Sequence, residues 1–168
     1  MTFTAETPII GWEPISAAQI NGWIAQRGQA MAAQFAPDGI YRPAPVNLGE
    51  LIIQACQYYP DAKVNPYVLT SQVDVESAAW QSALARNKNN PTGMGAEDSN
   101  PYDLAITFAT PWEAVFATAN HLRVYALGDG PWSQHDPRAN KIPAANKGTT
   151  RRVLDLSGRY ATDKTYHT

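Results

Sequence analysis

The sequence has 168 residues, of which 44% are hydrophobic and 17% charged, and its formal net charge is −2. This composition predicts one folded domain, residues 1–168, and excludes a disordered chain. The weak charge argues against nucleic acid as a partner, and no stretch approaches the ~20 apolar residues that membrane insertion requires.

The first helices are predicted from residues that favour the starts and ends of helices. Ser16 and Gln19 have the spacing of a capping box, which predicts a helix from about residue 17 to Phe35. Residues 36–46 are rich in Pro and Gly and predict a loop. Asn47 is expected to cap a second helix that ends before Pro60.

A third helix is predicted from Pro66 to about Arg86, because Asn65 is a favourable N-cap residue and proline is favoured at the first helical position. Residues 87–109 are expected to be irregular, with a short strand near 105–109. The sequence Thr-Pro-Trp-Glu at 110–113 predicts a capping box and a long helix to about residue 127. A loop over 128–148 and a short helix over 151–157 complete a mainly α domain.

Glu76 is the most informative residue of the predicted third helix. At 100° per residue it shares a face with Leu69, Val73 and Trp80, whereas Asp74 falls towards the other side. A carboxyl group beside apolar side chains loses solvation, which favours its protonated form and suits it to donate a proton. The alternative is a structural acid that is satisfied by a backbone amide or by Arg123.

Four further motifs follow Glu76 in order. They are Asn-Asn-Pro-Thr-Gly-Met-Gly at 89–95, His-Leu-Arg-Val-Tyr-Ala at 121–126, Asp-Pro-Arg at 136–138 and Gly-Arg-Tyr-Ala at 158–161. This order resembles the glucosaminidase family of peptidoglycan hydrolases, glycoside hydrolase family 73 and its bacterial and phage relatives. The family-like region covers residues 47–167, and residues 1–46 would be an N-terminal extension with one helix.

The resemblance implies a lysozyme-like helical domain with a reduced or absent β-lobe. It also implies an endo-β-N-acetylglucosaminidase that cleaves β-1,4 glycosidic bonds of peptidoglycan, with Glu76 as the general acid. The candidate for a second carboxylate is Glu97, with Asp98 and Asp103 also available in the same stretch, and the use of the substrate's own acetamido group in place of a second acid stays open. The candidate substrate-binding side chains are those of Asn89, Asn90, Asp98 and Tyr160, although at least one of the two asparagines is expected to shape the turn instead. Two departures from the family are the sequence Glu-Ser-Ala at 76–78 in place of Glu-Thr-Gly, and the short span between Asn90 and Thr110.

The other histidine and acidic motifs are expected to be structural. His121 is expected in the core or behind the site, and Asp136 and Arg138 are expected to brace their loop. The three histidines have no metal-ligand spacing and the single cysteine, Cys56, lies in an apolar run, so neither a metal nor a cofactor is predicted.

Two other functions stay open at this point. One is a muramidase or lytic transglycosylase, which would cut the other glycosidic bond. The other is a cell-wall-glycan-binding module without catalysis. The N-terminal residues lack the features of a secretory signal. We therefore expect a protein that is made in the cytoplasm and acts on the cell wall, as a phage endolysin released by another protein or as a domain excised from a secreted hydrolase. We also expect it to be a monomer.

Overall fold

The computed structural model describes residues 4–157, and over these residues the protein is mainly helical and has no strand. The predicted mainly α class is confirmed, and the architecture is compatible with a lysozyme-like helical domain without a β-lobe. The predicted short strand near 105–109 is wrong for the described chain, in which only isolated bridges occur, between Pro8 and Arg152 and between Ile10 and Val64.

The described residues contain five α-helices and several short 3₁₀ helices. The α-helices are α1 (Ala17–Phe35), α2 (Leu48–Gln57), α3 (Pro66–Ser77), α4 (Ala83–Lys88) and α5 (Pro111–Leu127). The 3₁₀ helices are η1 (Pro60–Ala62), η2 (Ser133–His135), η3 (Ala139–Lys141), η4 (Ala144–Asn146) and η5 (Val153–Leu156). None of the helices within residues 4–157 combines the length and apolar character needed to cross a membrane.

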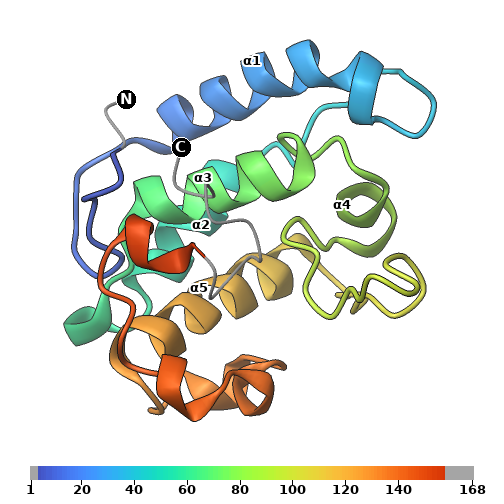
Figure 1. The fold of residues 1–168 in the computed structure, drawn as a ribbon. Helices are drawn as coiled ribbons and strands as arrows, with labels where there is room; N and C mark the ends of the chain where they lie inside the picture. The colour runs from blue at the N-terminus through green and yellow to red at the C-terminus, as the bar shows by residue number, and fades with distance from the viewer. Residues whose placement is uncertain (1–3, 158–168) are drawn as a thin grey trace.

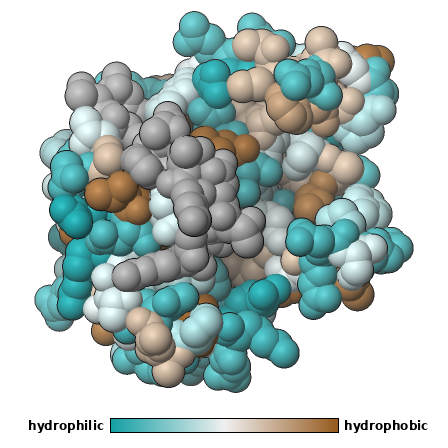
Figure 2. Space-filling view, viewed as in Figure 1, coloured by the Kyte–Doolittle hydropathy of each residue, from teal (hydrophilic) through white to brown (hydrophobic). Residues whose placement is uncertain are grey.

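Helices α1, α3 and α5 pack around α2 (Figure 1). Fully buried side chains from all of these helices and from the segment before α1 form the main core, among them Ile9, Ile20, Ile52, Leu69 and Leu122. The predicted core position of Cys56 is confirmed, since its side chain is fully buried. In the coloured parts of the face shown in Figure 2, hydrophobic residues form small separate areas among hydrophilic ones.

The helix starts depend on side chains close in sequence, with one exception. The Ser16–Gln19 capping box is present, and Thr110 Oγ1 accepts a hydrogen bond from the Glu113 backbone N–H at 3.2 Å. Asn47 occupies the cap position of α2 but makes no side-chain cap bond. Instead Asn21 Oδ1, from α1, accepts the Gly49 N–H at 2.7 Å, so the first turn of α2 is capped from a neighbouring helix.

The predicted third helix from Pro66 to Arg86 is wrong beyond Ser77. Ala78, Ala79 and Trp80 follow with φ values of 50°, 55° and 72°, which are left-handed. The Ser77 hydroxyl accepts the Trp80 N–H at 2.8 Å and the Asp74 carbonyl accepts the Ala79 N–H at 2.8 Å, so local bonds replace the next helical turn. The chain then re-enters a helix at α4, with Ser82 as its N-cap.

The end of α2 is held by Arg123 of α5, which is fully buried. Its guanidinium donates hydrogen bonds to the carbonyl oxygens of Ala55, Cys56 and Ala62. Cations favour the C-terminal end of a helix, where carbonyl groups lack intrahelical partners. Burial lowers the pKa of Arg123 to about 10, which leaves it charged at neutral pH. Arg123 therefore ties α5 to the end of α2.

Candidate functional site

Glu76 lies in the last turn of α3 and is half-buried. Leu69 and Val73, which share its predicted face, are fully buried, whereas the adjacent Val75 is 63% exposed. Trp80 is buried as predicted, but it reaches the core through the left-handed turn and not along the same helix. Glu76 is thus a half-buried carboxyl group in the last turn of a largely buried helix.

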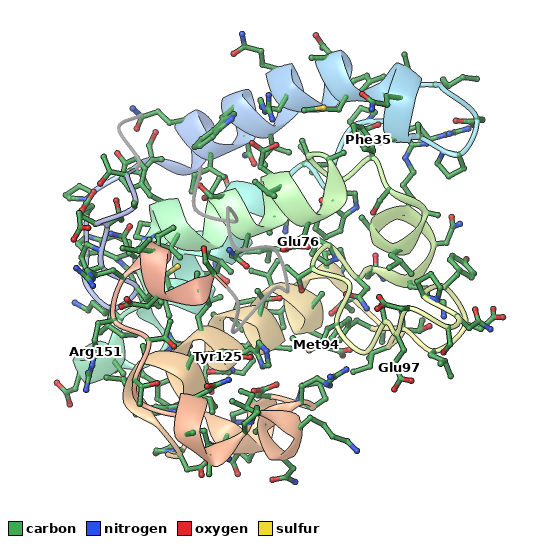
Figure 3. The ribbon with its side chains drawn as sticks, viewed as in Figure 1. Phe35, Glu76, Met94, Glu97, Tyr125 and Arg151 are labelled. Carbon is green, nitrogen blue, oxygen red and sulfur yellow. The ribbon has the colours of Figure 1, made fainter. Side chains whose placement is uncertain are left out.

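A pocket of about 250 Å³ lies between α1 and the end of α3, and Glu76 is one of its lining residues. Arg27 and Phe35 of α1 line it on one side, and Asp74 lines it together with Glu76. Figure 3 labels Glu76 at the C-terminal end of α3 and Phe35 at the end of α1. The pocket therefore holds two carboxyl groups from one helix turn.

The position of Asp74 differs from the sequence prediction, which placed its side chain on the side of the helix away from the apolar face. Its side chain is buried and its carboxylate pairs with Arg27 of α1, with 3.1 Å between Asp74 Oδ2 and Arg27 Nε. Burial raises the pKa of Asp74, and the nearby Arg27 opposes this rise. The ion pair joins residues 47 positions apart, so no local sequence pattern signals it.

The turn at 89–96 is built by its two asparagines. Asn89 ends α4 with a left-handed φ of 49°, and its Nδ2 donates to the Phe108 carbonyl at 3.1 Å. Asn90 is fully buried; its Nδ2 donates to the Met94 and Ile106 carbonyls at 2.8 and 2.9 Å, and its Oδ1 accepts the Met94 N–H at 2.8 Å. Both side chains thus shape the loop, and the buried amide of Asn90 is committed to it.

A second pocket, of about 310 Å³, brings together three of the motifs that follow Glu76 in the sequence. Its lining residues come from the 92–96 loop, from α5 and from the 138–143 segment: Thr92, Gly93, Met94, Gly95, Ala96, His121, Tyr125, Arg138, Lys141, Ile142 and Pro143. Met94 and Tyr125 are labelled in Figure 3. Glu76 lines the first pocket and is not one of the residues that line this second pocket.

His121 and Asp136 form a pair beside this second pocket. His121 Nδ1 lies 2.8 Å from Asp136 Oδ2, and Asp136 Oδ1 accepts the Arg138 backbone N–H at 2.8 Å. Asp136 is buried, which agrees with its predicted bracing role. The Tyr125 ring packs edge-on against the His121 ring, and burial followed by the nearby Asp136 raises the pKa of Tyr125. Sequence reasoning had not placed His121, Tyr125 and Arg138 at one pocket.

The predicted second acids lie on the surface of the loop. Glu97 and Asp98 are exposed, and Figure 3 shows Glu97 on the outer side of the molecule, pointing away from Glu76. Asp103 is also exposed, and its carboxylate accepts a hydrogen bond from Asn100 Nδ2 at 2.9 Å. The predicted substrate contact of Tyr160 lies outside the described residues.

Within residues 4–157, no three His, Cys, Asp or Glu side chains gather in an arrangement that could hold a metal ion. No model of a known protein family matches this chain, and no curated protein matches it. The chemical groups that the structure does present are the half-buried Glu76 carboxyl, the Arg27–Asp74 ion pair beside it, and the polar pocket formed by the 92–96 loop with His121 and Tyr125.

Proposed function

We propose that this protein hydrolyses β-1,4 glycosidic bonds of bacterial peptidoglycan, as an endo-β-N-acetylglucosaminidase in which Glu76 is the general acid. The observation that carries the proposal is the position of Glu76, half-buried at the end of a helix whose other residues are mostly buried, and lining a pocket. A proton donor for a leaving oxygen needs this combination of partial desolvation and access.

The order of motifs along the chain gives independent support. Glu76 is followed by the Asn-Asn turn at 89–95, by His121 with Tyr125, and by Asp136 with Arg138, which is the order that resembles glucosaminidases. The structure brings residues of these three later motifs together at one pocket. A carbohydrate polymer is compatible with a polar pocket of this kind, because sugars are bound mainly through hydroxyl and amide groups.

The chemistry proposed for Glu76 is protonation of the glycosidic oxygen as the bond to the sugar breaks. Glu97 and Asp98 are exposed on the loop, so a second carboxylate from this loop would act only after the loop moved towards Glu76. The substrate's own acetamido group is the alternative, since some glycosidases use it in place of a second protein carboxylate.

The test is a comparison of three proteins on purified peptidoglycan: the wild type, Glu76→Gln and Glu13→Gln. Glu13 is an exposed glutamate on the segment before α1, which makes it a matched control for the loss of a carboxylate. Loss of a proton donor typically costs ~10²–10⁴-fold in rate. We expect that loss in Glu76→Gln with unchanged thermal unfolding, and wild-type activity in Glu13→Gln.

Mass spectrometry of the released fragments identifies the bond that is cut. Reducing ends of N-acetylglucosamine would support the proposed specificity. Reducing or anhydro ends of N-acetylmuramic acid would instead indicate a muramidase or a lytic transglycosylase. A wild-type protein that binds the wall and releases no fragment would contradict the enzyme proposal and favour a glycan-binding module. Near-wild-type activity in folded Glu76→Gln would remove Glu76 from the mechanism.

A further inference from the structure

The 310 Å³ pocket has a charge pattern that a neutral sugar does not require. We infer that this pocket is a binding subsite for a carboxylate group of the substrate, held by Arg138 and Lys141. The inference rests on the proposed function for the identity of the substrate, since peptidoglycan carries carboxylates on its muramic acid lactyl groups and on its peptides. It assigns to the Asp-Pro-Arg segment a role in recognition in addition to loop bracing.

The first support is that, within residues 4–157, the two cationic side chains of the pocket have no carboxylate partner. Within residues 4–157, neither the Arg138 guanidinium nor the Lys141 ammonium group makes a salt bridge or a side-chain hydrogen bond. Several other cations of the described chain are ion-paired with carboxylates: Arg27, Arg42, Arg86, Lys147 and Arg152. Two cations without a carboxylate partner therefore converge on one pocket, as expected for an anion site.

The second support is the absence of a competing carboxylate in the described lining. No Asp or Glu is among the lining residues that the structure describes. The nearest acid of this segment, Asp136, is buried behind it, and both of its carboxylate oxygens are engaged, one with His121 and the other with the Arg138 backbone N–H. Asp136 thereby fixes the backbone that carries Arg138 while its own carboxylate does not pair with the Arg138 guanidinium.

The shape of the pocket suits a small group with a polar and an apolar side. Its volume lies at the lower end of the range for small-molecule sites. Met94, Ile142 and Pro143 supply an apolar wall next to the cations. Gly95 has a φ of +83°, and a Cβ there would lie 2.9 Å from Ile106, so the loop can approach this closely only with glycine. A lactyl or peptide carboxylate with its neighbouring methyl group matches this lining.

One hydroxyl of the pocket lining, that of Thr92, is oriented by its neighbours. Thr118 Oγ1 donates to the Ala114 carbonyl at 2.9 Å, so its single hydrogen is used there. Thr92 must therefore be the donor in the 3.1 Å contact between the two threonine hydroxyls. Thr92 presents an oxygen that accepts hydrogen bonds, which suits a sugar hydroxyl or a peptide N–H beside the bound carboxylate.

The experiment measures binding by calorimetry with three soluble probes that differ in their carboxylates. The tetramer of N-acetylglucosamine has none, a peptide-free tetrasaccharide of alternating N-acetylglucosamine and N-acetylmuramic acid has lactyl carboxylates, and the same tetrasaccharide with stem peptides has peptide carboxylates. The proteins are the wild type, Arg138→Gln, Lys141→Gln, the double variant and Arg151→Gln. Arg151 is an exposed arginine that does not line the pocket, which makes it the matched control.

We expect Arg138→Gln to weaken binding of one carboxylate probe about tenfold or more, the loss typical of a hydrogen bond to a charged group. Lys141→Gln, at an exposed position, should weaken it about threefold. Neither variant should change binding of the neutral tetramer more than about twofold, and Arg151→Gln should match the wild type. Weakening confined to the peptide-free probe would identify the lactyl carboxylate, and weakening confined to the peptide-bearing probe would identify the peptide.

The inference would be overturned if the double variant bound both carboxylate probes as the wild type does, if it lost affinity equally for the neutral tetramer, or if the wild type bound no probe. Thermal unfolding of each variant checks the fold, and the exposed Lys141→Gln substitution keeps the test decisive if Arg138→Gln fails to fold. Wall hydrolysis is measured separately. Hydrolysis without a charge effect on binding rejects the subsite alone, and a charge effect without hydrolysis rejects the enzyme proposal alone.

Discussion

Arg27 of α1 holds the carboxylate of Asp74 in α3, with its Nε 3.1 Å from Oδ2 and 3.3 Å from Oδ1. Asp74 is only 4% exposed, so this pair joins the two helices at a point where a lone carboxylate would be poorly solvated. Glu76 lies two residues further along and lines the same pocket. The ion pair therefore braces the helix turn that carries the proposed general acid.

The pH dependence of stability should reveal the raised pKa of the Asp74 carboxyl group. Burial raises its folded pKa above the ordinary value of 3.8, so in the window above 3.8 the folded protein keeps a proton that the unfolded chain releases. The contribution of Asp74 to stability is therefore complete below that value and is lost as pH rises through the folded pKa. We expect the free energy of unfolding of the wild type, relative to Asp74→Asn, to decrease as pH rises from about 4, measured by urea unfolding at each pH.

The Arg27→Gln variant is the control for this assignment. Arg27 lowers the pKa of Asp74 against the effect of burial, so its removal should move the decrease in stability to higher pH. A difference between wild type and Asp74→Asn that is constant with pH would contradict the assignment.

The two glycines of α1 should respond in opposite directions to alanine. Gly22 is exposed and a Cβ there would meet no atom within 4 Å, so Gly22→Ala should stabilise the protein by up to about 1 kcal/mol through helix propensity. A Cβ at Gly28 would lie 2.9 Å from Gln81 Nε2 and 3.2 Å from the Ala79 carbonyl oxygen. Gly28→Ala should therefore destabilise the protein by about 1–3 kcal/mol, as overpacking does.

The Gln81 amide cannot move cheaply away from Gly28, because its Nε2 donates to the Arg42 carbonyl at 2.9 Å. Chemical unfolding of the two single variants gives the comparison. Equal effects of the two substitutions would mean that α1 does not approach the left-handed turn after α3 as closely as described.

Asn90→Ala separates a structural role from substrate binding. The substitution would leave the buried Met94 N–H and the Ile106 carbonyl without the partner that Asn90 supplies, whereas the Met94 carbonyl would keep its hydrogen bond from the Ile106 N–H at 2.9 Å. At about 1–3 kcal/mol for each buried group left unpaired, with partial compensation by water, we expect a loss of at least about 2 kcal/mol. The exposed Asn100→Ala should stay within about 0.5 kcal/mol of wild type. Unchanged stability with weaker glycan binding in Asn90→Ala would instead support the substrate contact predicted from the sequence.

The loop acids are tested by initial rates of wall lysis at saturating substrate. Because Glu97, Asp98 and Asp103 are exposed, and Glu97 points away from Glu76, we expect Glu97→Gln, Asp98→Asn and Asp103→Asn each to stay within about threefold of wild type. A fall of a hundredfold or more in Glu97→Gln, without weaker wall binding, would assign it as the second acid and would require the loop to close on the substrate.

The sequence by itself predicts the helical class and the starts of α1, α3 and α5. These starts depend on Ser16, on Asn65 with Pro66 and on Thr110 with Pro111, whose side chains or rings act on backbone groups within three residues. Such short-range interactions form in the same way whatever the rest of the chain packs against. The burial of Cys56 and Trp80 is predicted for a similar reason, since their apolar side chains are stabilised by removal from water in any compact fold.

Tertiary structure decides the end of α3, the cap of α2 and the burial of Asp74. The helical repeat of apolar residues in the sequence predicts one buried face. However, α3 is covered on several sides, so its polar residues Thr70 and Gln72 are buried as well as Asp74. Asn21 replaces Asn47 as the cap because α1 and α2 lie close together. The pocket beside His121 arises in the same way, because residues distant in sequence become neighbours only when burial of the core brings their helices and loops together.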